Sequence, residues 1–117
     1  MAYSEFLADK VRQRLVNKGK VVEKKMMGGL IFMVNDKMCI GIDMDKNSQS
    51  DRLMVRVGKL PYETLLKKEG SRPMDFTGSV MRGFLFIDPE GFDKEEDLDF
   101  WIQKALEFNR LIEKAYC

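Results

Sequence analysis

Two short apolar segments separated only by Asn35-Asp36 constrain the fold of this chain more than any other feature of its sequence. The first segment covers residues 30–34 and the second covers residues 37–42. Asn and Asp tolerate the positive φ that a two-residue β-hairpin turn requires, so this spacing predicts a hairpin. Strands joined by so short a turn pair antiparallel, because a parallel pair needs a long crossover connection. We therefore expect an antiparallel sheet in the middle of the chain.

Further apolar segments extend this sheet. Strands are expected over residues 21–27, 53–57 and 83–87. Residues 43–51 are polar and predict a loop, and Pro73 favours an extended segment because it disfavours helix for the residue before it. The extended segment is expected over residues 72–78.

Helices are expected over residues 4–17, 62–68 and 94–114. Ser4 is placed to cap the first helix, whose apolar stripe consists of Phe6, Leu7, Val11 and Leu15. The buried stripe of the last helix consists of Leu98, Trp101, Ile102, Ala105, Leu106 and Ile112. This stripe is widened by Phe100, Phe108 and Leu111, which leaves apolar surface for a partner and is compatible with a homodimer.

The element order is therefore α-β-β-β-α-β-β-α, with three or four strands in the first run. An antiparallel sheet with helices packed on it gives a two-layer α+β fold. The 117 residues suit one domain, so we take residues 1–117 as a single unit.

Composition excludes several classes of function. The chain has no histidine, which excludes Ser-His-Asp and Cys-His catalysis and HExxH zinc sites. Cys39 and Cys117 are too far apart in sequence for a CxxC pair, and Cys39 is expected to be buried. No metal or cofactor is expected. The charged N-terminal segment lacks a signal-peptide core and no apolar stretch is long enough for a membrane span, so a cytoplasmic protein is expected.

The formal net charge of +1 conceals an uneven distribution. Residues 1–25 carry a net charge of +4, residues 88–117 carry −5, and the segment between them carries +2. If the terminal helices lie side by side, their charges pair; if they lie apart, the molecule has a basic and an acidic face that could steer a charged partner.

Six charged residues are candidates for binding a partner or an anion: Lys24, Lys25, Arg56, Arg72, Asp75 and Arg82. The two lysines precede a glycine pair and could hold an anion, or could lie one on each face of a strand end. Asp75 is expected to be semi-buried, as a general acid or base or as a partner of turn amides or an arginine. The nine methionines fit either a soft core or an adaptable binding face.

Five segments taken together resemble the TfoX/Sxy N-terminal domain family. They cover residues 23–30, 51–58, 72–78, 81–84 and 89–91, the last shortly before Trp101. The resemblance implies an α-β(3)-α-β(2)-α two-layer domain. It also implies a role like that of relatives that regulate competence genes as co-activators beside a DNA-bound transcription factor. Those regulators carry a second, helical domain, so this chain is expected to be a stand-alone domain of the N-terminal type.

Together these observations favour a non-enzymatic regulatory domain that binds a protein partner, with a transcription factor as the candidate. Two alternatives stay open. The chain could bind nucleic acid directly through the basic first helix and Lys24, Lys25, Arg52 and Arg56. It could also be a small-ligand protein or an enzyme that uses Asp75, Glu90 or Arg82 in a pocket.

Overall fold

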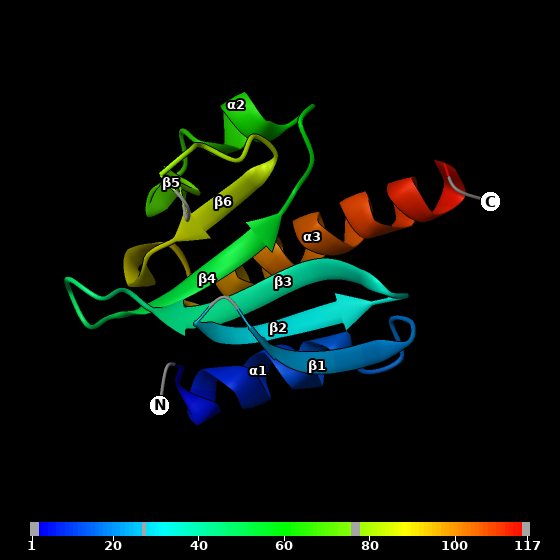
Figure 1. Cartoon of the computed structure of the whole chain (residues 1–117), viewed down its shortest axis with the longest axis horizontal. Coiled ribbons are helices and arrows are strands. Elements are labelled where there is room, and N and C mark those ends of the chain that lie inside the picture. Colours follow the sequence, from blue (N-terminus) through cyan, green and yellow to red (C-terminus); the bar gives the residue numbers. More distant parts are fainter. Residues whose placement is uncertain (1–2, 27, 76–77, 116–117) are drawn as a thin grey trace.

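A computed structural model describes residues 3–26, 28–75 and 78–115, with side chains described as far as residue 112. Figure 1 shows a single sheet with α1 and the long α3 crossing one of its faces. The elements are α1 Glu5–Leu15, β1 Val21–Met26, β2 Gly29–Val34, β3 Lys37–Met44, β4 Asp51–Arg56, α2 Tyr62–Leu65, β5 Ser71–Pro73, β6 Phe84–Ile87, a 3-10 turn Pro89–Gly91, and α3 Glu95–Ala115. No helix within the described residues has both the length and the apolar character of a membrane span.

The six strands form one antiparallel sheet in the order β1-β2-β3-β4-β6-β5. The predicted α+β class is confirmed, and of the three or four strands expected in the first run, four are formed. The predicted hairpin is formed by β2 and β3, with Val34 paired to Lys37. Asn35 and Asp36 both have positive φ, 53° and 68°, as a tight two-residue turn requires.

The main core lies between the sheet and the helices. Alternate strand residues such as Phe32, Ile40 and Leu53 meet Trp101 and its neighbours on α3 there. Trp101 donates its indole N–H to the carbonyl of Gly91 over 3.0 Å, which satisfies its buried polar group. The predicted stripe of α3 is buried from Leu98 to Leu106, and Ile112 is half-buried.

The opposite face of the sheet carries a smaller apolar cluster. The fully buried members are Ile31, Met54, Met74 and Phe86, and partly buried methionines pack around them. Met54 and Met74 are therefore core residues, whereas Met26 on β1 is 44% exposed. Among the described methionines the core interpretation therefore holds for Met54 and Met74, while Met33, Met38 and Met81 pack on the core with part of their surface exposed.

The terminal helices lie side by side, and their opposite charges pair. Lys10 on α1 lies 2.5 Å from Glu95 on α3. Arg14 lies 2.5 Å from Glu95 and also pairs with Asp99. Hydrogen bonds from Lys10 and Arg14 lower the pKa of Glu95. The dipolar sequence therefore does not produce separate basic and acidic helices.

Two expectations for the helices need correction. Phe6 was expected in the buried stripe of α1, but it is 73% exposed. The buried face is set by Leu7, Ala8, Val11 and Leu15, and Phe6 lies about a quarter-turn beyond its edge. The predicted helix over residues 62–68 ends at Leu65, because the chain continues in tight turns toward Gly70.

Two expectations for the connections also need correction. The predicted loop over residues 43–51 is shorter, because Asp43 and Met44 extend β3 and Asp51 begins β4. Of the described residues in the predicted extended segment 72–78, only Arg72 and Pro73 belong to a strand, β5, and Gly78 donates its N–H to the Asp75 carbonyl over 3.1 Å. The expectations for Met27, Phe76, Thr77 and Cys117 lie outside the described residues.

Candidate functional site

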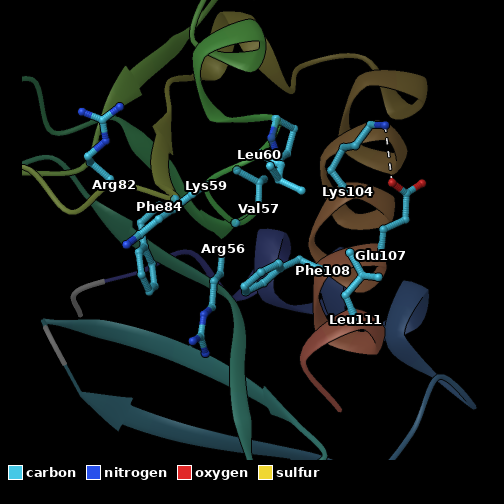
Figure 2. Close-up of a pocket in the computed structure, with 13 residues that line it drawn as sticks. Arg56, Val57, Lys59, Leu60, Arg82, Phe84, Lys104, Glu107, Phe108 and Leu111 are labelled. Atoms are coloured by element: carbon cyan, nitrogen blue, oxygen red, sulfur yellow. Dashed lines mark hydrogen bonds and ion pairs between the residues drawn. The ribbon is translucent and has the colours of Figure 1, made fainter. Parts of the chain in front are cut away.

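A hollow of about 400 Å³ lies beyond the end of β4, where three parts of the chain converge (Figure 2). We call it the cationic hollow. Its apolar lining consists of Val57, Leu60, Pro61, Phe84, Phe108 and Leu111. Its charged lining consists of Arg56, Lys59, Arg82, Lys104 and Glu107. The residues come from the end of β4 and the β4–α2 connection, from the start of β6 and the turn before it, and from the middle and C-terminal part of α3.

Two glycines let these three parts approach closely. Gly58 and Gly83 both have positive φ, 85° and 94°. The Gly83 carbonyl accepts the N–H groups of Val57 and Gly58 over 2.8 and 3.0 Å, which joins the two connections. The Phe108 ring packs on Gly58 so closely that a Cβ there would lie 2.5 Å from its Cε1 atom. Position 58 therefore has room for glycine alone while the ring stays in place.

Arg56 is held between two aromatic rings from different elements. Its guanidinium carbon lies 5.4 Å from the centroid of the Phe84 ring and 5.3 Å from that of Phe108, within cation–π range. Arg56 forms no ion pair with any carboxylate in the part of the chain that the structure describes. The structure therefore positions a cation beside the apolar lining without neutralising it.

The other cations lie around the edge of the hollow. Lys104 is 3.5 Å from Glu107, and Arg82 is 3.8 Å from Glu63. Both members of the Arg82–Glu63 pair are about two-thirds exposed, so this pair contributes little stability. Figure 2 shows the Arg82 guanidinium directed away from α3, on the outer side of the hollow. Four cations and one carboxylate line the hollow, so its edge is positively charged.

A second hollow, of about 490 Å³, lies on the face of the smaller cluster; its lining includes Asp43, Asp45 and Arg52, whose charges are paired, and the ion-paired Arg72 lies within reach of Asp45. Arg52 binds both carboxylate oxygens of Asp43, over 3.0 and 2.8 Å, and its guanidinium lies 3.7 Å from the Phe86 ring centroid. Arg72 binds both oxygens of Asp88, over 2.6 and 2.8 Å. Asp45 lies between the two arginines, 3.7 Å from Arg52 and 3.5 Å from Arg72.

The environment of Asp45 fits a structural role. A hydrogen bond from the Asn47 backbone N–H and the charges of Arg52 and Arg72 lower the pKa of Asp45. The bidentate pairs Arg52–Asp43 and Arg72–Asp88 are strong charge-assisted hydrogen bonds within the chain. They leave little of the charge of either arginine for binding a ligand. Within the described residues, no group of three or more carboxylates or thiols is placed to hold a metal ion.

The six predicted site residues do not form one site. Arg56 and Arg82 line the cationic hollow. Asp75 lines the second hollow and is exposed, not semi-buried as expected; its backbone carbonyl accepts the Gly78 N–H. Arg72 is engaged by Asp88 and Asp45. The remaining two, Lys24 and Lys25, are exposed on β1 and, as successive strand residues, point to opposite faces.

Sequence reasoning did not find several residues of the cationic hollow. Gly58, Leu60 and Lys104 have no motif that would join them, because they are brought together by the tertiary fold. One signal was present, since Phe108 and Leu111 widen the apolar stripe of α3 beyond what the core uses. Leu111 is 62% exposed, which agrees with apolar surface outside the core.

These features define a small two-layer α+β domain that carries an open apolar hollow with a cationic edge. The chain belongs to the TfoX N-terminal domain family, whose family model matches residues 13–109. The match confirms the family resemblance, and it includes all six strands and most of the cationic hollow. No curated protein and no solved structure matches the chain significantly.

Proposed function

We propose that this chain is a non-enzymatic regulatory domain that binds a protein partner at the cationic hollow. The observation that carries the proposal is exposed apolar surface beside the hollow: Leu60 is 96% exposed and Leu111 is 62% exposed. Both line the hollow together with the half-buried rings of Phe84 and Phe108. Apolar side chains gathered at one place on a surface are typical of protein contacts.

Membership of the family supports a particular kind of protein partner. The resemblance to regulators of competence genes supports a transcription factor as the partner, with this domain acting beside it in the cytoplasm. Direct nucleic-acid binding has less support, because the basic side chains of α1 are largely paired. Arg12 binds Glu23 over 2.5 and 2.8 Å, and Lys10 and Arg14 bind carboxylates of α3. An enzyme built on Asp75 and Arg82 has less support too, since these residues line different hollows.

The proposal is tested by site-specific photocrosslinking in the native host. A photoreactive phenylalanine analogue replaces Leu60, and a matched control carries it at Phe6, which is 73% exposed on α1. We expect position 60 to crosslink a discrete protein that mass spectrometry identifies and that position 6 does not capture. Crosslinks that are equal at the two positions, or that contain nucleic acid alone, would contradict the proposal.

A further inference from the structure

The cationic hollow also carries information about the chemistry of its partner. Resting on the proposed function, we infer that the partner inserts an acidic amphipathic segment, in which large apolar side chains are flanked by carboxylates. The argument uses the shape of the apolar surface, the position of the cations, and the pairing of charges elsewhere on the chain.

The apolar surface has two sides. Leu60 lies on the β4–α2 connection, and Phe108 and Leu111 lie one turn apart on α3, with Val57 between them in Figure 2. A large aliphatic or aromatic side chain fits between these two sides and removes apolar surface on both from water. A helix or short segment that docks in this way usually contributes two or three such anchors.

The cations favour carboxylates around those anchors. Arg56 is held between the Phe84 and Phe108 rings, so it loses little conformational freedom when it binds an anion. Lys59 is exposed and also lines the hollow. The lining has one carboxylate, Glu107, and Lys104 lies beside it. The edge is thus complementary to negative charge at several separate points.

A peptide segment fits this surface better than a small anion does. Pockets for small molecules bury most of the ligand surface, which requires walls that enclose it. Here Leu60 is 96% exposed at the edge, so the apolar contact continues outside the hollow. The cations also come from three separate parts of the chain, whereas one small molecule brings one or two anionic groups. An occupant with several carboxylates along a chain meets both conditions.

A second copy of this chain is a poorer occupant. Its acid-rich stretch is the start of α3, and there Glu95 and Asp99 bind Lys10 and Arg14 of the same molecule. Docking that stretch into another copy would break these pairs. The favoured occupant is therefore an acidic segment of a different protein.

The test measures fluorescence anisotropy of labelled synthetic peptides on the full chain. One peptide has Leu and Phe at helical spacing with Asp and Glu between them. A second has Lys in place of every acidic residue, and a third has Ala in place of Leu and Phe. We expect the first peptide alone to bind, and its affinity to fall as salt concentration rises, because part of the attraction is between exposed charges.

Variants of the chain show whether the acidic peptide binds at the cationic hollow. Leu60→Asp and the double variant Lys59→Glu/Arg82→Glu change exposed positions, so the fold is expected to remain intact. We expect each to weaken binding by about tenfold, because Leu60→Asp removes a leucine side chain that the bound peptide would cover and the double variant reverses two attractive charges. The matched controls are Val16→Asp, at a position 59% exposed on α1, and Lys25→Glu on β1. Both should bind within about twofold of the original chain, because a single distant surface charge has little effect.

Any of four results would overturn the inference. The basic peptide could bind as well as the acidic one, or Leu60→Asp could bind like the original chain. Dodecanoate, a small apolar anion, could bind where the acidic peptide does not. Sedimentation could instead show a dimer that Leu60→Asp abolishes. If position 60 crosslinks a protein but the acidic peptide does not bind, the inference is wrong while the proposed function stands. If the crosslinking fails as well, both are wrong.

Discussion

Replacement of Gly58 by Ala tests whether the packing of Phe108 on the backbone builds the cationic hollow. Gly58 has φ of +85°, and an added Cβ would lie 2.5 Å from Phe108 Cε1. Two separate costs follow: an L-residue in a left-handed conformation and a collision with an aromatic ring. We expect Gly58→Ala to be among the most destabilising single-methyl additions in this chain.

Each cost has its own magnitude. The left-handed conformation costs about 1–2 kcal/mol for a residue with a Cβ. The collision adds about 1–3 kcal/mol, as overpacking does when neighbours must shift. Gly58→Ala should therefore lower the free energy of unfolding by about 2–5 kcal/mol. Gly78→Ala isolates the first cost, because Gly78 has φ of +84° and nothing within 4 Å of an added Cβ.

A double-mutant cycle isolates the second cost. Phe108→Ala alone should cost about 1–2 kcal/mol, since the ring is half-buried. In Gly58→Ala/Phe108→Ala the collision is gone, so the double variant should be more stable than the sum of the single effects by about 1–3 kcal/mol. Urea denaturation followed by the fluorescence of the single tryptophan, Trp101, measures all of these free energies.

The outcome that would refute the reasoning is additivity. If the single effects at Gly58 and Phe108 sum to that of the double variant, the ring does not pack on position 58 as described. If Gly58→Ala costs no more than Gly78→Ala, the collision is absent, and the cost belongs to backbone conformation alone.

Three further predictions concern other parts of the molecule. A hydrogen bond from Arg12 lowers the pKa of Glu23 below its ordinary value of 4.5. The stability from this pair is therefore present above about pH 4.5 and lost as pH falls through the folded-state pKa, so Glu23→Gln should flatten the acid side of a plot of unfolding free energy against pH. Burial raises the pKa of the Cys39 thiol to about 12. In a Cys117→Ser background, a thiol reagent at pH 8 should therefore react with Cys39 only after the chain unfolds. Rapid reaction with the folded chain would place Cys39 at the surface. Asn109 is 2% exposed, and its side-chain amide donates to the Val34 carbonyl on β2 over 3.0 Å. Asn109→Ala should therefore lower the free energy of unfolding, measured by urea denaturation, by about 1–3 kcal/mol. An unchanged urea midpoint would contradict that hydrogen bond.

The parts of the fold that were predictable from sequence are those determined by neighbouring residues. The β2–β3 hairpin follows from Asn35 and Asp36, because their positive φ is a local property of the turn. The first helix follows from its Ser4 cap, whose Oγ accepts the Leu7 N–H over 3.2 Å. Phe6 was misplaced because spacing alone defines an apolar stripe but not where its edge meets the core.

The candidate site was less predictable, because it depends on how connections turn. Asp75 and Arg82 are close in sequence, and this proximity suggests that both side chains line the same pocket. The Met81 N–H binds the Met74 carbonyl over 2.8 Å, so these two residues close the base of the intervening turn. Asp75 enters that turn and Arg82 leaves it, and the two side chains therefore reach different hollows. No spacing rule contains this information.

The pairing of charges explains how a nearly neutral chain can present a cationic surface. Several cations, among them Arg14 on α1, Arg52 on β4 and Arg72 on β5, are bound to carboxylates of the same molecule. Arg56 forms no such pair with a described carboxylate, because two aromatic rings hold it instead. Net charge counts all of these cations alike, whereas an approaching partner interacts mainly with those that are not neutralised. The selectivity of this domain is therefore expected to depend on the position of Arg56 and its neighbours beside the apolar lining, and much less on the total charge.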